Sequence, residues 1–240
     1  MVVAISIGCC HDLKLTRLES IHFLEKYSID GMELVFALPE ELINFEFDEK
    51  ALTILSKLSF VSIHMPFENI TYKEDKETKQ LLNKAITLAK QVNAQYLVFH
   101  PPTIKDFNSI KNNQIQICIE NMSKKENSYK TINELKITLG NHLFLGLVID
   151  CSHILGNNLT PTDFLILKDK IKAIHVSGQW NKKGILKEHG FITEGTKEQL
   201  ELIKPILKLK VPKVIESDFY PNKVLLIEQE IQLIKELETL

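Results

Sequence analysis

The sequence predicts an α/β chain folded as an eight-stranded parallel (β/α)8 barrel, with residues 1–240 forming a single domain. Three observations predict this fold. Eight short apolar runs rich in β-branched residues are typical of buried parallel strands. Amphipathic segments that are typical of helices lie between these runs. Six of the runs end in an acid or a histidine, and the carboxyl ends of the strands of such a barrel meet at one mouth.

The expected elements alternate along the chain without a long linker or a repeat. We place strands near residues 2–7, 30–36, 60–64, 95–100, 115–120, 145–150, 171–176 and 212–216. We place helices at Leu15–Tyr27, Asp48–Leu58, Asp75–Val92, Tyr129–Leu139, Thr160–Leu167, Thr196–Leu209 and Pro221–Leu237. Thr160 followed by Pro161 is typical of a helix cap with proline in the first turn.

One crossover is unusually short. Fourteen residues separate His100 from Ile115, and a crossover between parallel strands needs about a dozen or more residues. We therefore expect a truncated fourth helix. The long loops follow strands two, three, six and seven, and we expect Ser177–Gly195 after strand seven to contribute most to function.

Composition limits the classes of partner. The formal net charge is −2, and Arg17 is the single arginine among 29 basic residues. A strongly basic nucleic-acid binder is excluded, and any grip on phosphate must use lysine, backbone amides or metal. The apolar runs are too short to span a membrane, the start lacks a basic signal region, and the four cysteines form no CxxC pair. We expect a cytoplasmic monomer or small homo-oligomer without membrane contact.

Carboxylate and imidazole side chains end the last four predicted strands. An unpaired charge at the end of a buried strand is costly, and a metal ion offsets that cost. A mixed carboxylate and imidazole set suits zinc, manganese or iron. Four unrelated ion pairs are a weaker explanation of the whole set. The predicted ligands are Glu120, Asp150, His175 and Glu216.

Histidines also end the third and fourth strands. These are His64 in HMPF and His100 in HPP. A single histidine after an apolar strand is usually a hydrogen-bonded core residue, but two on neighbouring strands beside Glu120 indicate a second metal. His153 in DCSH and His189 in KEHGF are candidates either for further metal ligands or for substrate contacts.

With these residues in place, the sequence resembles the xylose isomerase-like TIM-barrel superfamily, and within it the endonuclease IV type. The resemblance covers nearly the whole chain from strand two onward. It rests first on histidines that end strands three, four and seven, which are His64, His100 and His175. A Glu-Asn pair ends strand five (Glu120-Asn121), and a D-x-x-H motif ends strand six (Asp150 with His153). A glutamate ends strand eight (Glu216), and the HGFITEG stretch contains His189.

The resemblance implies a zinc centre of up to three ions. One would be held by His64, His100 and Glu120, and a second by Asp150, His175 and Glu216, with Glu120 bridging the two. The third would be held by His153, His189 and an aspartate, but Lys187 stands in the place of that aspartate. A lysine cannot act as an anionic ligand. We therefore expect two ions, or one, rather than three.

The first hypothesis for function is endonuclease IV-like cleavage of phosphodiester bonds in abasic-site DNA. Two metals would activate a hydroxide and stabilise charge on the phosphate. Glu120 would bridge the metals and position the nucleophile. Lys187 and other lysines of the loop after strand seven would meet the DNA backbone, and Trp180 could stack on a base.

The second hypothesis is isomerisation or epimerisation of a sugar or sugar phosphate. By resemblance, one ion, Mn or Mg rather than Zn, would polarise the substrate oxygens, and Glu120 and Glu216 would act as an acid–base pair. Lys187 would then hold a terminal phosphate or carboxylate, and Glu33 in DGMELVF is expected among the substrate-binding residues. His64 and His100 favour the hydrolase slightly, whereas chain length, charge and Lys187 favour the isomerase. A closed pocket the size of one sugar would reverse that preference.

Overall fold

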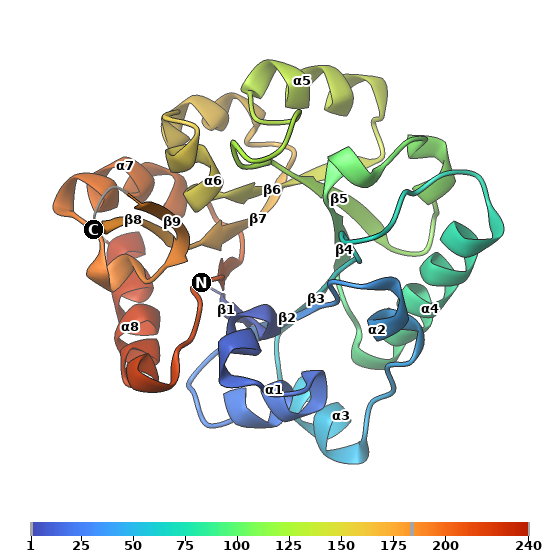
Figure 1. Cartoon of the computed structure of the whole chain (residues 1–240), viewed down its shortest axis with the longest axis horizontal. Helices are drawn as coiled ribbons and strands as arrows, with labels where there is room; N and C mark the ends of the chain where they lie inside the picture. Colours follow the sequence, from blue (N-terminus) through green and yellow to red (C-terminus); the bar gives the residue numbers. More distant parts are fainter. Residues whose placement is uncertain (1, 183–184, 240) are drawn as a thin grey trace.

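Eight parallel strands close into a barrel in the computed structural model (Figure 1). The structure describes residues 2–182 and 185–239, and of these it describes the backbone alone for 180–182, 185–187, 238 and 239. The order around the barrel is β1-β10-β7-β6-β5-β4-β3-β2. The predicted fold class is therefore confirmed, and each predicted strand overlaps an observed one. The strands are β1 (Val3–Ser6), β2 (Gly31–Val35), β3 (Phe60–His64), β4 (Tyr96–Phe99), β5 (Gln116–Glu120), β6 (Leu145–Asp150), β7 (Ile171–Val176) and β10 (Lys213–Ile215).

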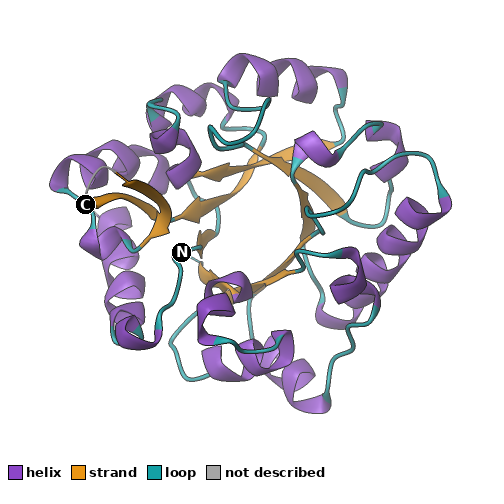
Figure 2. Cartoon of the chain, viewed as in Figure 1, coloured by secondary structure: helices purple, strands orange, loops and turns teal. Residues whose placement is uncertain are grey.

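Helices form a ring outside the barrel (Figure 2). They are α1 (Arg17–Leu24), α2 (Pro39–Ile43), α3 (Glu49–Ser56), α4 (Lys76–Val92), α5 (Ile132–Asn141), α6 (Cys151–Gly156), α7 (Lys197–Leu207) and α8 (Leu226–Thr239). Shorter 3-10 segments are η1 (Ile7–Leu13), η2 (Pro101–Thr103), η3 (Phe107–Ile110), η4 (Pro161–Leu167), η5 (Ile192–Glu194) and η6 (Pro221–Lys223). Two 3-10 turns, η2 and η3, stand where a fourth helix would be, as expected from the short crossover.

Several elements differ from the sequence prediction, beginning with the helices α2 and α6, which lie in segments expected to be loops. The segment predicted as a helix at Thr160–Leu167 is the 3-10 helix η4, whose first residue is Pro161. The segment Ser177–Gly195, expected to be a loop, contains an antiparallel hairpin of β8 (Gly178–Lys182) and β9 (Ile185–Gly190). This hairpin stands apart from the barrel sheet and packs against α6.

Helix ends follow from local sequence. Thr16 caps α1 and Thr131 caps α5, and in each case the glutamate three residues later closes a capping box. The carboxylate of Asp75 accepts a hydrogen bond from Thr78 N at the start of α4. Asn93 ends α4 with a left-handed φ of 52°, a conformation that asparagine tolerates better than most residues. These signals allow most of the outer ring to be predicted.

The barrel has an apolar floor and an outer apolar layer between strands and helices. The floor is a separate cluster on the strand positions that alternate with the helix-facing ones. At Gly31 a Cβ atom would lie 2.6 Å from the carbonyl oxygen of Phe60 and 2.6 Å from its Cδ1. Glycine is therefore required where Phe60 fills the floor. The floor cluster consists of Ala4, Phe60, Tyr96, Val98, Cys118, Val148, Ala173 and Val214.

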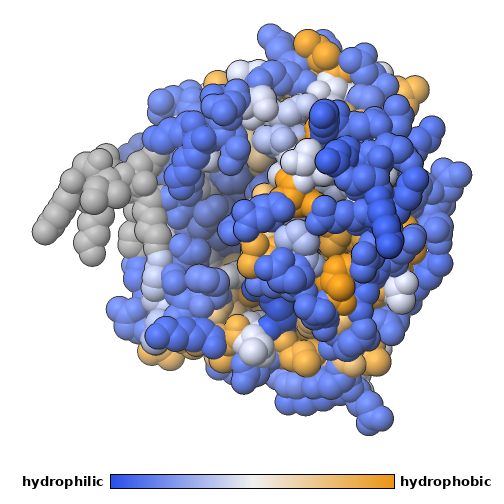
Figure 3. Space-filling model, turned by 45° about the vertical axis from the view of Figure 1, so that its right-hand side comes forward, coloured by the Kyte–Doolittle hydropathy of each residue, from blue (hydrophilic) through white to orange (hydrophobic). Residues whose placement is uncertain are grey.

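The outer surface is mixed in polarity. Figure 3 shows one face on which apolar residues are scattered among hydrophilic ones. Within the described chain, no helix has the length and apolar character needed to cross a bilayer.

Candidate metal centre

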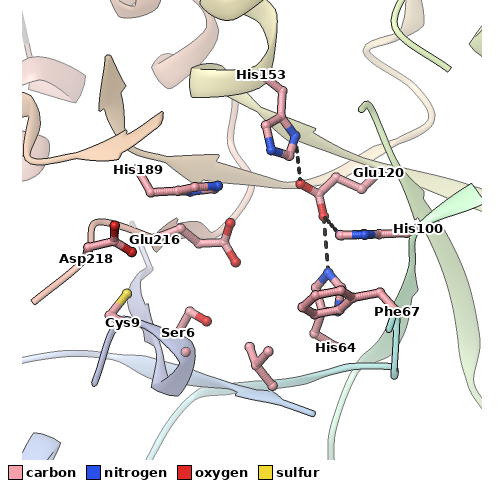
Figure 4. Close-up of a pocket in the computed structure, with 12 residues that line it drawn as sticks. Ser6, Cys9, His64, Phe67, His100, Glu120, His153, His189, Glu216 and Asp218 are labelled. Atoms are coloured by element: carbon pink, nitrogen blue, oxygen red, sulfur yellow. Dashed lines mark hydrogen bonds and ion pairs between the residues drawn. The ribbon is translucent and has the colours of Figure 1, made fainter. Parts of the chain in front are cut away.

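A pocket of about 260 Å³ lies at the carboxyl ends of the barrel strands (Figure 4). Period-two alternation places its residues. Cys118 on β5 belongs to the apolar floor, and Glu120 two residues later lines the pocket. Val214 and Glu216 are related in the same way. The lining residues are Ser6, Gly8, Cys9, Val35, His64, Phe67, His100, Glu120, His153, His189, Glu216 and Asp218.

Glu120 is the centre of this constellation. Its Oε2 lies 3.2 Å from His64 Nε2 and 3.5 Å from His100 Nε2. Its Oε1 lies 3.3 Å from His153 Nδ1 and 3.6 Å from His175 Nδ1. Figure 4 shows the carboxylate between His153 on one side and the His64–His100 pair on the other. The two oxygens therefore face two different sets of nitrogens, which is the geometry of a bridging carboxylate.

Three groups of side chains could each hold a metal ion. In each group the candidate ligand atoms lie within 4.8 Å of one another. Glu120 is shared by the first and second groups, and Asp150 by the second and third. The groups are His64 with His100 and Glu120; Glu120 with Asp150, His175 and Glu216; and Asp150 with His153 and His189.

Unsatisfied polar atoms indicate that a cation fits the second group. Asp150 Oδ2 is buried and has no hydrogen-bond partner among the described residues. His175 Nδ1 lies 3.0 Å from Glu216 Oε2, yet this nitrogen has no hydrogen-bond partner within the described part of the chain. Buried polar atoms are nearly always satisfied. Carboxylate and imidazole donors aimed at one point suit a divalent ion of the zinc or manganese class.

Hydrogen bonds fix which nitrogen each histidine presents. A carbonyl oxygen only accepts, so His64 Nδ1 donates to Met65 O at 3.1 Å and leaves Nε2 facing Glu120. In the same way His153 Nδ1 donates to Asn121 O at 2.8 Å and leaves Nε2 for an ion or a substrate. Backbone acceptors of this kind commonly orient metal-binding imidazoles.

Charges in the pocket perturb one another strongly. Burial opposes a charge on Glu120, but the nearby imidazoles of His175, His100 and His153 hold the pKa of its carboxyl well below the usual range. Burial also disfavours the charged ring of His100 and lowers its pKa to about 4. For His153 the carboxylates of Asp150 and Glu120 outweigh burial and raise the pKa to about 10. Glu120 is therefore an anion, ready to bind a cation.

The comparison with protein families shows to which family the chain belongs. The model of the xylose isomerase-like TIM barrel matches residues 21–237. The chain belongs to this family. None of the curated proteins matches the chain by sequence. The resemblance inferred from the strand-end residues is thus confirmed at the level of the family.

Solved structures of similar fold include three named as different enzymes. The probable 3-DHS dehydratase AsbF from Bacillus anthracis has a TM-score of 0.74 and 13% identity, covering 98% of this chain and 99% of that one. D-allulose 3-epimerase from Methylomonas sp. has a TM-score of 0.69 and 13% identity, and the match covers 98% of this chain and 96% of that one. Endonuclease IV from Thermus thermophilus has a TM-score of 0.66 and 11% identity, and the match covers 99% of this chain and 98% of that one. At such identities the likeness concerns the fold alone.

The third ligand group takes its carboxylate from Asp150 and not from position 187, where the resemblance implies an aspartate. Lys187 lies on β9 opposite Trp180 on β8, but the side chains of both lie outside the described residues. Glu188, next to Lys187, is buried and pairs with Lys125 Nζ at 2.7 Å. His189 has a left-handed φ of 59°, which is uncommon for a residue other than glycine and is found at functional sites. Asp150 supplies the carboxylate of this group.

Several contributing residues were not singled out in the sequence. Phe67 stacks on His100 with ring centroids 4.6 Å apart, and the HMPF motif could have pointed to it. Glu230 on α8 accepts hydrogen bonds from Ile192 N at 2.7 Å and Ser217 Oγ at 3.0 Å. It thereby ties the segment after His189 to the residue after Glu216. An isolated glutamate in an amphipathic helix carries no sequence signal of this role.

Glu33 lies below the pocket rather than in it. Its side chain has no exposed surface, and it is absent from the described residues that line the pocket. Ser62 Oγ donates a hydrogen bond to Glu33 Oε2 at 2.8 Å, and His175 Nε2 lies 3.2 Å from Oε1. This position gives no support to the expectation that Glu33 binds substrate, because the side chain is fully buried and does not line the pocket.

Proposed function

We propose that the chain is a metal-dependent phosphoester hydrolase whose centre holds two divalent ions, with zinc as the expected metal and abasic-site DNA as the first substrate to test. One observation carries this proposal: His64 and His100 both face the same oxygen of Glu120, at 3.2 and 3.5 Å. A single-ion site built on Glu120, Asp150, His175 and Glu216 does not need these two histidines.

The charge of the donor set supports two ions. Glu120, Asp150 and Glu216 are three carboxylates, and all three belong to the second ligand group. With two divalent ions the carboxylates and imidazoles each gain a cation, which offsets the cost of burying several anions together. When bound, two such ions stabilise charge on phosphate oxygens and lower the pKa of water.

The protein's own residues then hold and enclose the substrate. Phe67 lines the pocket and packs on the ring of His100, which holds that imidazole in place beside Glu120. Asn121 accepts a hydrogen bond from Asp150 N at 2.7 Å and donates to Asp150 O at 3.1 Å. This pair of bonds fixes the ends of β5 and β6 to each other, so that Glu120 and Asp150 keep one relative orientation. We further propose that Lys187 and Trp180 contact the substrate from the hairpin.

The test combines metal content with two assays. Protein purified without added metal or chelator is analysed for ions per chain and assayed on a duplex with one abasic site and on a ketose panel. The hydrolase predicts two ions and strand cleavage. His64→Ala should reduce the count to one and abolish cleavage, whereas His11→Ala, at an exposed side chain outside the pocket, should leave both unchanged.

A sugar epimerase or isomerase is the second candidate, and the dimensions of the site favour it. The pocket volume of about 260 Å³ suits a single small molecule better than the extended surface that DNA requires. Glu120 and Glu216 both line this pocket and supply the two carboxylates of an acid–base pair. One ion per chain, exchangeable with manganese, together with turnover of a ketose that survives His64→Ala, would establish this function in place of the hydrolase.

A further inference from the structure

We propose that Glu33 is a positioning residue that fixes His175 as a metal ligand through Nδ1. This inference rests on the metal centre proposed above, and it concerns a residue outside the pocket. Glu33 lies on β2 in register with Ser62 on β3, one layer below the mouth, and is fully buried.

Two hydrogen bonds orient the Glu33 carboxylate. Ser62 Oγ donates to its Oε2 at 2.8 Å. His175 Nε2 lies 3.4 Å from Oε2 and 3.2 Å from Oε1, between the two oxygens. A carboxylate can only accept, so the proton of the His175 ring is held on Nε2. Glu33 is thereby the partner that decides the tautomer of His175.

The consequence appears on the opposite edge of the ring. With the proton on Nε2, the lone pair of Nδ1 is directed at Glu216 Oε2, 3.0 Å away, and Glu120 Oε1, 3.6 Å away. Nδ1 has no hydrogen bond among the described residues. Three acceptors at such short distance repel one another unless a proton or a metal ion lies between them, and the metal is the occupant that this proposal tests. Glu33 therefore acts on the second ligand group without touching the ion.

His175 is supported differently from the other histidines of the centre. His64 and His153 each donate to a backbone carbonyl, whereas His175 faces a full negative charge. An anionic partner raises the basicity of a ligand nitrogen, and loss of such a partner typically weakens metal binding 10- to 100-fold. Glu33 thus selects the second group as the tighter of the two sites that share Glu120.

A purely structural role is the competing explanation. A buried carboxylate beside Tyr96, whose hydroxyl is also without a hydrogen bond in the described chain, is costly to retain. Buried ion pairs are often no more stabilising than apolar residues of similar size. Stability alone therefore gives little reason to keep Glu33 at this position, but the two roles predict different effects on metal affinity.

The test compares metal affinity in wild type and Glu33→Gln, which keeps the size of the side chain and removes its charge. Chelator-treated protein is titrated with Co²⁺, followed by its visible absorption, and with Zn²⁺ in competition with a chromophoric chelator. We expect the tighter site to weaken by about 10- to 100-fold and the other site to keep its affinity. Ser62→Ala, which leaves the charge but removes one anchor, should weaken it by roughly two- to tenfold.

Thermal unfolding separates the explanations without an activity assay. If Glu33 acts only on the fold, Glu33→Gln lowers the melting temperature of metal-free and metal-loaded protein equally and leaves both affinities unchanged, which overturns the proposal. If Glu33→Gln does not fold, Ser62→Ala decides, and an unchanged affinity there also overturns it. A wild-type chain that binds no ion removes the proposed function and this inference together, whereas wild-type binding with an unaffected Glu33→Gln removes the inference alone.

Discussion

Replacement of the shared carboxylate, Glu120→Gln, tests the architecture of the centre most directly. The variant keeps the shape of the side chain and removes one charge that is almost fully buried. Its two oxygens face four imidazoles at 3.2 to 3.6 Å. Because each oxygen serves a different ligand group, we expect the count of bound ions to fall from two to less than one.

The stability of the metal-free Glu120→Gln variant gives a second, independent measurement. Removing one partner from a buried charge pair typically costs 3–5 kcal/mol, because the other partner stays buried without compensation. In a chain of about this size 1 kcal/mol moves the melting temperature by about 2–4 °C. A loss of about 3 kcal/mol therefore lowers the melting temperature in chelator by roughly 6–12 °C.

The assay is thermal unfolding in chelator, with elemental analysis of the same preparations before chelation. Glu68→Gln is the matched control, since it removes an exposed carboxylate in the loop after β3 and should change neither quantity. A Glu120→Gln variant that keeps the full metal content and the wild-type melting temperature would refute the assignment of Glu120 as the bridging group.

Three further predictions concern stability and reactivity. Gly31→Ala should lower the free energy of unfolding in urea by about 1–3 kcal/mol, because the new Cβ would meet Phe60. Gly140→Ala on α5, which has open space around it, should raise the same free energy by up to about 1 kcal/mol. Equal effects of the two substitutions would contradict the close approach of Gly31 to Phe60. Partial burial opposes the charge of Glu134, but hydrogen bonds from Thr131 and nearby backbone N–H groups outweigh it and lower the pKa of this carboxyl. A lowered pKa contributes stability that is present above the unfolded value and lost as pH falls through the folded one. Glu134→Gln should therefore cost about 0.5 kcal/mol at pH 7, and this cost should disappear as the pH falls through the lowered pKa of Glu134; a constant difference would exclude the carboxylate as its source. Burial raises the pKa of all four thiols, that of Cys10 to about 12; the others are Cys9, Cys118 and Cys151. Iodoacetamide at pH 8 should therefore label no thiol in the native protein and all four after denaturation. Rapid labelling of the native protein, detected by mass spectrometry, would contradict their burial.

The strands and the ligands at their ends could be predicted because both depend on local pattern. A run such as QICIE gives a buried strand, and alternation of its side chains brings Glu120 to the mouth without any knowledge of the neighbouring strands. The same reasoning holds for Asp150 on β6 and His175 on β7. The eight strands were therefore predicted to within one residue at each end.

Features that depend on pairing between distant residues were not predictable in this way. The strands of the β8–β9 hairpin, GQWNK and ILKEHG, lack a clear alternation of apolar and polar residues, so they do not stand out as strands. Glu33 sits on a strand with buried positions throughout, and only the register with Ser62 and the approach of His175 show that its partner is an imidazole rather than a substrate. The sharing of Asp150 between two ligand groups is likewise a property of the closed barrel.

The hairpin after β7 has a further consequence for how this site can change. Its base is fastened at both strands, since Gln179 Nε2 donates to Ser152 O at 2.8 Å and His189 N donates to Ser152 Oγ at 3.2 Å. Ser152 directly precedes His153, so one serine secures both histidines of the third ligand group. A substitution in the hairpin that spares these two anchors and the buried Glu188 therefore leaves in place the bonds that hold the two histidines. Such substitutions test whether the hairpin contributes to substrate choice while the centre itself stays unaltered.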